Sequence, residues 1–519
     1  MYCAPDHRWL HRFAVFTAVA TLCLIWVGGL VTSHGVGMAV PDWPTSYGYN
    51  MFYFPISKWV GGIFYEHTHR LLAVGVGVLT SLLAAWLWVR ETRGRTRWSG
   101  LAVIGLLVSM LGHRGSSQAE GGMEGVPMHI RVLAVIVPVL LALGIAQAVR
   151  TRGSLRWLGM TAFFAVILQG ILGGFRVAQM QDALGIFHAT LAQLFLVLVS
   201  AIALMTSRWW RAIEGGLKQG ARTAMSACVE AASQIGADKA VRAPASMVVE
   251  PARRLTGEPK LAIYDAGRLR YVFGFVTGLI LAQLVVGASM RHQHAGLAIP
   301  DFPSAYGRWW PATDADSIAR YNQDRVEVTA LNPITAAQVS LQMAHRIGAF
   351  CIFGAVAWLA GVARSRFGAG SPLARLAALW FGAILLQVIL GAATIWTNKA
   401  ADLATAHVAV GALSLVIGSI ATLVTWRAAG RTAGQMRGES SESSRLSNSV
   451  AADLRRNPRP NAGHLHLDPV GRGSCRAETS GLITARQEPR PTDVMDRRKG
   501  LAELVEKTAS LPRRLQSSA

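Results

Sequence analysis

The stretch GMAVPDWPTSYG, residues 37–48, follows one long apolar run and precedes another. A near copy, GLAIPDFPSAYG, occupies residues 296–307. Pro41 of the first copy corresponds to Pro300 of the second, an offset of 300 − 41 = 259 residues. Because proline fixes φ and aspartate makes local turns, each copy predicts a stiff loop between two helices. The repetition predicts two similar halves, with one such loop over the outer end of each.

The composition predicts a membrane protein. The chain has 519 residues, of which 52% are hydrophobic and 15% charged, whereas a soluble domain carries roughly 25% charge. A membrane-spanning helix needs roughly 20 apolar residues. The clear candidate spans are 13–33, 70–89, 157–175, 187–206, 271–290, 346–363, 376–396 and 404–425. We therefore expect an all-α polytopic membrane protein of two repeated four-helix bundles. Two weaker runs, 99–112 and 132–149, leave an extra hairpin in the first half open.

The net charge of +22 concentrates in short clusters that flank the apolar runs and in the C-terminal tail. This pattern follows the positive-inside rule of membrane topology. A nucleic-acid-binding protein instead carries its basic residues along one face, so we expect no nucleic-acid partner. The bilayer is the expected surroundings. About a dozen residues precede the first span, too few for a transit peptide, which favours a bacterial plasma membrane.

The repeat divides the chain into segments. We expect an N-terminal four-helix half over 13–206, interrupted by an insertion over 96–150. A cytoplasmic linker over 207–270 leads to a C-terminal half over 271–426. The tail, 427–519, is rich in Ser, Arg, Pro and Glu with few aromatic residues, which predicts disorder.

Each half carries one histidine on its second helix and one on its fourth. These residues are His69 and His188 in the first half, and His345 and His407 in the second. We place each within about one turn of the outer end of its helix, so the two rings of a half lie at equal depth. Histidine is a standard axial ligand of heme iron, and bundle cores commonly hold such cofactors. A single histidine at a membrane interface is usually only an interfacial polar residue. Four that are paired by a repeat favour metal ligation, because intramembrane ionisable groups are mostly functional.

The two halves differ beside the first histidine. Glu66 lies three residues before His69 on the same helical face, whereas the matching residue before His345 is Gln342. A carboxylate at the dry edge of a cofactor site can move protons, so Glu66 is a candidate catalytic residue. The alternative is a solvated glutamate that the helix dipole favours at the helix start. The asymmetry suggests chemistry in the first half and a structural or electron-transfer cofactor in the second.

Two arginines complete the candidate site, whereas another histidine and two cysteines are left out of it. Arg70 and Arg346, which follow the histidines, either pair with porphyrin propionates or reach toward lipid headgroups. His67 is not counted as a ligand, because it lies on another helical face and its repeat partner is Met343. Cys23 and Cys351 lie in apolar runs, where we expect small buried thiols.

The ordered set of motifs resembles the heme A synthase family over residues 13 to about 426. The motifs are GGLVTSHGVGMAVPDWPTSYG, EHTHRLL, LQGILGGFRV, IFHATLAQ, AHRIGAF and AHVAVGAL. The resemblance implies two facing four-helix bundles and oxidation of a ring methyl of heme O to the formyl group of heme A by successive hydroxylation. It also implies that His69 and His188 hold the substrate heme, and that Glu66 is the catalytic carboxylate. His345 and His407 would hold heme b.

The resemblance also implies partners and shows departures. Heme A serves terminal cytochrome oxidase, so the heme O synthase and oxidase assembly factors are candidate partners; a homo-oligomer stays open. No cysteine occurs between residues 34 and 65, where some members have a pair, and the insertion over 96–150 has no counterpart. The alternative function is a bis-histidine b-type cytochrome that relays electrons. The sequence leaves the electron acceptor and the oxygen source open.

Overall fold

A computed structural model describes residues 8–112, 126–211 without Arg152 and Met180, 264–325 and 333–427. All of these belong to the first of two compact units, Met1–Ser449. Apart from Arg427, the predicted tail over 427–519 falls outside the described residues, and so does most of the linker over 207–270.

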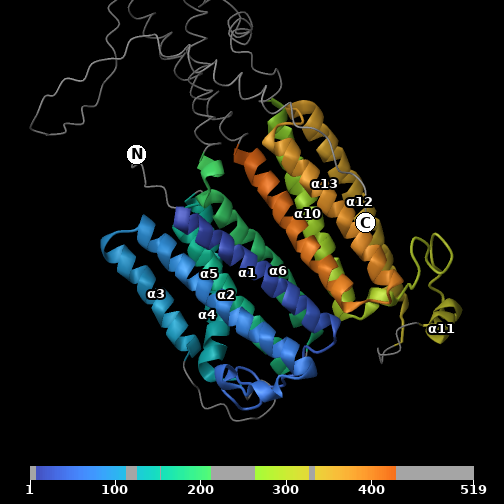
Figure 1. Cartoon of the computed structure of the whole chain (residues 1–519), viewed down its shortest axis with the longest axis horizontal. Helices are drawn as coiled ribbons and strands as arrows, with labels where there is room; N and C mark the ends of the chain where they lie inside the picture. The colour runs from blue at the N-terminus through green and yellow to red at the C-terminus, as the bar shows by residue number, and fades with distance from the viewer. Residues whose placement is uncertain are drawn as a thin grey trace, which may run out of the picture. The chain divides into compact units, whose positions relative to one another are not determined.

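Four helices of the first half run alongside one another (Figure 1). They are α1 (Arg8–Ser33), α2 (Gly61–Glu91), α5 (Leu155–Gln179) and α6 (Asp182–Thr206). α1 contacts α2 and α6, and α5 contacts the same two helices. Fully buried side chains such as Leu10, Leu83 and Val199 fill the space between them. The four helices therefore form a closed ring around an apolar core, as expected for a four-helix bundle.

The insertion adds two helices to this bundle. They are α3 (Gly94–Gly112), which packs on α2, and α4 (Met128–Arg150), which packs on α5. Trp88, Ile104, Leu133 and Phe163 share one buried cluster across these helices. The extra helical pair that the weaker apolar runs left open is thus present, outside the four-helix ring.

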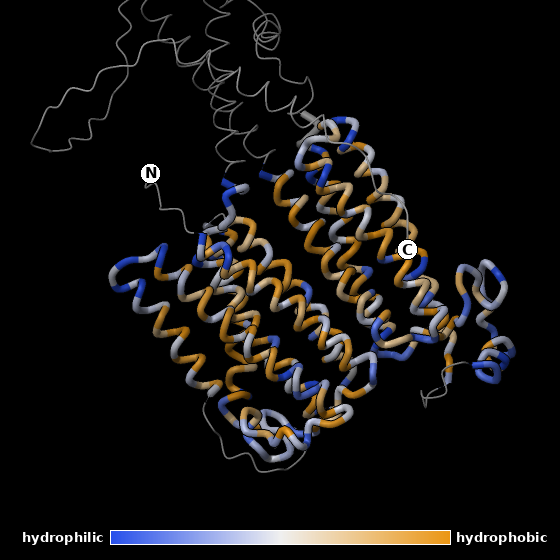
Figure 2. Tube along the Cα trace, in the orientation of Figure 1, coloured by the Kyte–Doolittle hydropathy of each residue, from blue (hydrophilic) through white to orange (hydrophobic). Residues whose placement is uncertain are grey.

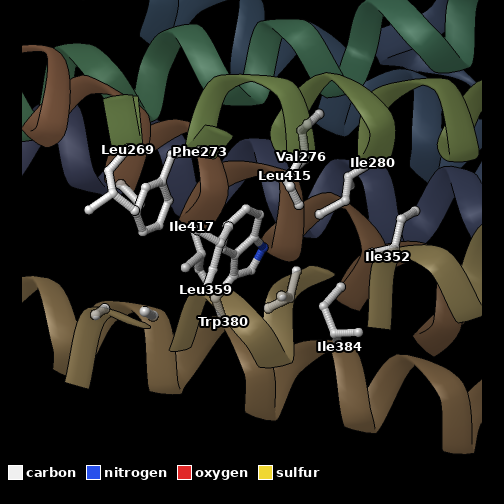
Figure 3. Close-up of a cluster of buried hydrophobic side chains, with 14 of the residues drawn as sticks. Leu269, Phe273, Val276, Ile280, Ile352, Leu359, Trp380, Ile384, Leu415 and Ile417 are labelled. Carbon is white, nitrogen blue, oxygen red and sulfur yellow. The ribbon is translucent and has the colours of Figure 1, made fainter. Parts of the chain in front are cut away.

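The second half contains four helices of similar layout. They are α10 (Tyr264–His292), α12 (Ala336–Phe367), α13 (Pro372–Trp396) and a last described helix, Ala401–Arg427. Trp380 lies at the centre of their core with Phe273 and Leu359 (Figure 3). Its indole nitrogen donates to Ser414 Oγ at 3.1 Å, which satisfies the polar atom of the largest buried side chain.

Local sequence signals set the starts of two helices. A capping box begins α12, because Thr335 and Gln338 exchange hydrogen bonds between side chain and backbone. Ser371 caps α13 by accepting from the Ala374 amide, and proline follows at the first helical position.

Nine helices within the described residues are long and apolar enough to cross a membrane. Apolar residues run along most of their length, and polar residues gather at the ends and in the loops (Figure 2). The prediction of an all-α polytopic membrane protein is confirmed. Two details were wrong. Cys23 and Cys351 are exposed on the outside of their helices rather than buried. α2 begins at Gly61 and α12 at Ala336, so His69 and His345 lie about two turns into their helices instead of within the first turn. His188 and His407 also lie beyond the first turn of α6 and of the last helix.

Candidate functional site

The first loop is folded around the carboxylate of Asp42. Asp42 accepts hydrogen bonds from Thr45 Oγ1 at 2.5 Å, the Tyr47 amide at 2.6 Å and the Gly48 amide at 2.9 Å. The Tyr47 hydroxyl donates to the Ala39 carbonyl at 2.5 Å. Gly48 adopts a φ of +73°, which glycine tolerates without strain. The turn is therefore fixed by one side chain within the loop itself.

The second loop repeats this arrangement bond for bond. Asp301 accepts from Ser304 Oγ at 2.6 Å, the Tyr306 amide at 2.7 Å and the Gly307 amide at 2.9 Å. The Tyr306 hydroxyl donates to the Ala298 carbonyl at 2.6 Å. The sequence repeat is therefore also a repeat of three-dimensional structure.

We expect the loops to loosen in acid. Burial raises the pKa of Asp42, but hydrogen bonds from Thr45, Gly48 and Tyr47 outweigh it and hold the pKa below its usual value of 3.8. Because the folded pKa is lowered, this stabilisation is present above about pH 4 and is lost as the pH falls through the folded pKa. The hydrogen-exchange protection factors of residues 37–48 in wild-type protein should therefore fall below about pH 4. Asp42→Asn should exchange fast already at pH 7; protection equal to wild type at pH 7 would contradict this.

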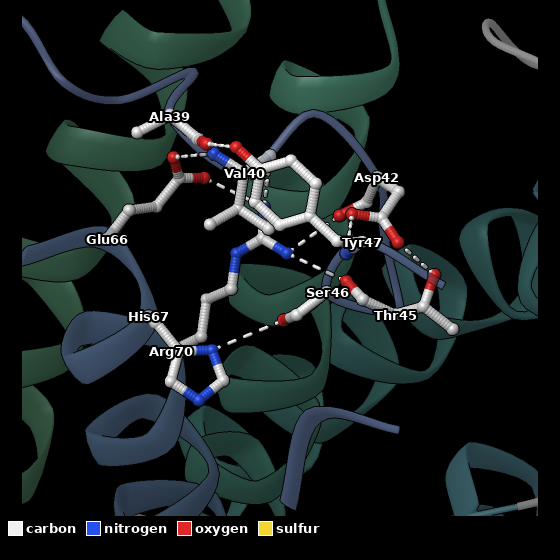
Figure 4. Close-up of polar contacts among 9 residues, drawn as sticks. All are labelled: Ala39, Val40, Asp42, Thr45, Ser46, Tyr47, Glu66, His67 and Arg70. Atoms are coloured by element: carbon white, nitrogen blue, oxygen red, sulfur yellow. Dashed lines mark hydrogen bonds and ion pairs between the residues drawn. The ribbon is translucent and has the colours of Figure 1, made fainter. Parts of the chain in front are cut away.

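Glu66 and Arg70 tie the first loop to α2 (Figure 4). Arg70 donates to the backbone carbonyls of Val40 at 2.7 Å, Asp42 at 2.7 Å and Thr45 at 3.0 Å. Its other contact is an ion pair with Glu66 at 2.7 Å, and the second carboxylate oxygen of Glu66 accepts from the Val40 amide at 2.8 Å. Glu66 is 3% exposed. The alternative of a solvated glutamate at the helix start is therefore wrong.

Gln342 and Arg346 tie the second loop in the same way. Gln342 Oε1 accepts from the Ile299 amide at 2.7 Å, and Arg346 donates to the carbonyls of Asp301 and Ser304 at 2.7 and 2.8 Å. A neutral glutamine therefore supports this loop as well as the glutamate supports its counterpart. The hydrogen bond to the loop amide therefore does not require a negative charge at this position; in the first half that charge is paired with Arg70.

The second histidine pair has the spacing of a metal-bridged pair. The ring centroids of His345 and His407 lie 6.3 Å apart, with an interplanar angle of 63°. An imidazole nitrogen binds a metal at roughly 2 Å, so two rings on opposite sides of one metal ion place their centroids about 6 Å apart. The side chains come from α12 and the last helix, which begin at the same end of the bundle.

Backbone carbonyls orient two of the four rings. His188 Nδ1 lies 3.2 Å from the Gln169 carbonyl, and His407 Nδ1 lies 3.1 Å from the Gln387 carbonyl. Because a carbonyl only accepts, each Nδ1 carries the proton and Nε2 keeps its lone pair for a metal. Metal-binding histidines usually make such a hydrogen bond through the ring nitrogen that does not bind the metal.

The other two rings differ between the halves. Gln283 Nε2 lies 3.0 Å from His345 Nδ1 and donates to the His345 carbonyl at 2.7 Å. Ligation through Nε2 requires a proton on Nδ1, so this amide must present its oxygen when metal is bound. The matching residue in the first half is Leu24, whose backbone lies beside His69, and His69 Nδ1 is buried without a hydrogen bond of ordinary geometry. His69 is thus the less constrained ring.

A glycine on the neighbouring helix faces each of the four rings. A Cβ atom would lie 2.9 Å from His69 if placed on Gly28, and 3.1 Å from His188 if placed on Gly173. In the second half the glycines are Gly287 beside His345, at 3.2 Å, and Gly391 beside His407, at 3.0 Å. At each of these glycine positions, the side chain of any other residue would enter the space that the histidine ring occupies. Sequence reasoning missed these glycines, although LQGILGG and LQVILGA are among the repeated motifs.

We expect alanine at these glycines to displace the histidines. Gly28→Ala should disturb His69, and Gly287→Ala should disturb His345, because the added methyl group is closer to the ring than van der Waals contact allows. Cofactor content of the affected half, measured in purified protein, should fall several-fold. Gly77→Ala on α2 is the matched control, since nothing lies within 4 Å of its added Cβ. Equal cofactor content in all three variants would contradict the packing argument.

The first pair has additional charged and aromatic neighbours. His188 lies close enough to His69, Arg176 and His292 for their charges to interact. Arg176 on α5 also reaches Gly37 of the first loop. Sequence reasoning missed both Arg176 and His292, because the other half has a different type of residue at each corresponding position.

An aromatic residue of the first loop reaches α5. A Cβ on Gly174 would lie 2.3 Å from the Trp43 ring, and Gly174 follows the glycine that faces His188. The second half has the smaller Phe302 and the larger Ala392 at the matching positions. The first loop therefore packs over the helix that supports His188.

His67 takes part in the loop. It lies 3.2 Å from Ser46 Oγ, and its ring packs on Phe54 and Trp59. It is fully buried there. These contacts agree with leaving His67 out of the candidate ligands.

Comparison with known proteins identifies a family that matches part of the chain. Residues 243–418 match the family COX15-CtaA, described as cytochrome oxidase assembly protein. This stretch is similar to the COX15-CtaA family. It carries the second loop and both histidines of the second half, so the 6.3 Å pair lies inside the matched region.

Two relatives of the COX15-CtaA stretch carry the name heme A synthase. The one from Rhodopseudomonas palustris strain BisB5 is 30% identical over 172 residues, which are 33% of this chain and 44% of the relative. The one from strain HaA2 is 29% identical over 172 residues, 33% of this chain and 43% of the relative. The match thus spans less than half the length of either relative. With its apolar helices, the chain is a multi-pass protein of the bacterial plasma membrane.

Proposed function

We propose that this protein is a heme A synthase, an oxidoreductase that converts the ring methyl of heme O to the formyl group of heme A by successive hydroxylation. The observation that carries the proposal is the His345–His407 pair, whose separation suits two axial ligands of one iron, within the stretch that matches the family. The repeat supports a second pair at His69 and His188, which lie on the corresponding helices of the first half and have corresponding glycine contacts.

The residues present fit a heme in each half. Buried imidazoles, glycines that leave room for the rings, and carbonyl partners at Nδ1 of His188 and His407 are the features of histidine ligands. A heme bound at His345 and His407 would be heme b and would supply one-electron chemistry. A heme bound at His69 and His188 would be the substrate.

The protein groups around the substrate have separate tasks in this proposal. His69 and His188 hold the heme, and the loop of residues 37–48 covers its outer edge and limits access of water. Glu66, buried beside His69, exchanges protons with the reacting edge of the substrate. Arg70 fixes the Glu66 carboxylate through the 2.7 Å ion pair. Any contact of Arg70 and Arg346 with heme propionates would be made in addition to their hydrogen bonds to the loop carbonyls.

The alternative function is a b-type cytochrome that relays electrons between two bound hemes. Glu66 is buried, and the matching residue of the second half is the neutral Gln342. This difference favours the enzyme, because an electron relay does not need a carboxylate in one half only. Candidate protein partners of the enzyme are the heme O synthase and assembly factors of cytochrome oxidase.

Extraction of pigments distinguishes the two functions. Full-length protein is expressed in a bacterial host that makes heme O but no heme A, and the hemes are separated by chromatography and identified by mass. The enzyme should yield heme A or its hydroxylated intermediate. A strain that carries the empty vector is the control. Only unmodified hemes bound to the purified protein would support the relay and contradict the synthase.

A further inference from the structure

Arg291 lies between the two halves and belongs to neither loop. It is near the end of α10, and its guanidinium donates to the Gly29 carbonyl at 2.5 Å and to Ser33 Oγ, both on α1. Ser33 also lies 3.1 Å from the Thr405 hydroxyl of the last helix. Three helices from two halves therefore meet at one cation.

The same place lies beside both histidine pairs. Gly28, whose neighbour Gly29 accepts from Arg291, is the residue that faces the His69 ring. A Cβ on Gly29 would lie 2.8 Å from Thr405, two residues before His407. Arg291 is also close enough to His407 for their charges to interact. Arg291 therefore lies close to the second histidine pair and contacts the helix, α1, that packs against His69.

The charge of Arg291 is not neutralised by the described residues. Among the described residues it has hydrogen-bond acceptors but no carboxylate partner, and Glu66, three residues before His69, is paired with Arg70. Partial burial strengthens the interaction of such a charge with its neighbours, because solvent screens it less. A cation near a heme iron favours the reduced, less positive state of that iron.

We propose that Arg291 sets the reduction potential of the heme held by His345 and His407, raising it through its positive charge while it joins α10 to α1. The inference rests on the proposed function, since it needs a heme in the second half. Arg291 is a positioning and tuning residue: it acts on the iron through its charge and touches no reacting atom.

The test is a spectroscopic redox titration of purified full-length protein. The heme of the second half is assigned as the low-spin signal that disappears in His407→Gly. Arg291→Gln should lower its midpoint potential, with a roughly tenfold fall in the equilibrium constant for reduction, equal to about 59 mV for one electron. Arg291→Lys keeps the charge and should stay close to wild type. Arg375→Gln, an exposed residue of α13, is the control and should cause no shift.

A second variant keeps the arginine and cancels its charge. Ser33→Asp places a carboxylate where Arg291 already donates a hydrogen bond, and it should lower the potential as Arg291→Gln does. Ser33→Asp tests the effect of the charge on the potential if Arg291→Gln does not retain heme. An unchanged potential in the heme-containing neutralised variants would overturn the inference, as would an equal shift in Arg291→Lys. If wild type itself shows no such heme, the proposed function fails instead.

Discussion

Glu66→Gln should abolish oxidation of heme O while both hemes stay bound. Gln342 already supports the second loop at the matching position with a neutral amide, so the substitution keeps the hydrogen bond to the Val40 amide. It removes the ability to take up and release a proton, and also the negative charge paired with Arg70. Arg346 keeps its loop contacts beside the neutral Gln342, so we expect Arg70 to keep its own. General acid–base groups contribute roughly 10²–10⁴-fold to rate, so we expect at least about a hundredfold loss. The measurement is heme A formed per bound heme O.

Glu66→Ala is the comparison that separates chemistry from support of the loop. It leaves Arg70 without its ion-pair partner and the Val40 amide without an acceptor. Removing one partner of a buried ion pair costs roughly 3–5 kcal/mol, so this variant should lose loop protection as well as activity. If Glu66→Gln oxidises heme O at the wild-type rate and only Glu66→Ala is inactive, Glu66 supports the loop and is not catalytic.

His407→Gly should remove the heme of the second half. The substitution deletes one of two rings that lie 6.3 Å apart, and the remaining His345 cannot form a six-coordinate low-spin iron alone. Heme per purified chain should fall by about half if both sites are filled in wild type. Imidazole added to the buffer should enter the vacated space and restore the low-spin spectrum.

The matched control for this variant is His34→Ala. His34 is exposed, donates to the Leu30 carbonyl of its own helix and lies outside the candidate ligands. Its heme content should equal that of wild type. An unchanged low-spin spectrum and heme count in His407→Gly would show that this ring is not a ligand.

The sequence predicted the architecture because the features that define it are local. Apolar runs of membrane-spanning length predicted the helices, and the repeat of Pro41 and Pro300 predicted two loops that fold alike. The start of α2 was misplaced, because GGIFYEHTH is less apolar than the run that follows. Its helical structure depends on contacts between Glu66, Arg70 and the loop, which lie more than twenty residues apart in sequence.

The contacts between the halves could not be predicted in this way. Arg291 and His292 have no equivalents in the repeat, so the comparison that identified the paired histidines passed over them. Their importance comes from the meeting of α1, α10 and the last helix, which is a tertiary property. Arg70 and Arg346 show the reverse case: their position suggested propionates or headgroups, and the structure shows their contacts with loop carbonyls.

The most direct test of the account is electron paramagnetic resonance of the oxidised, purified wild-type protein, together with heme per chain. Two imidazoles on one iron predict a low-spin ferric signal for each filled site; the signal of the second half is lost in His407→Gly and kept in His34→Ala. A protein that binds no heme, or one whose low-spin signal is the same in His407→Gly, would contradict the claim that these histidine pairs hold iron porphyrins.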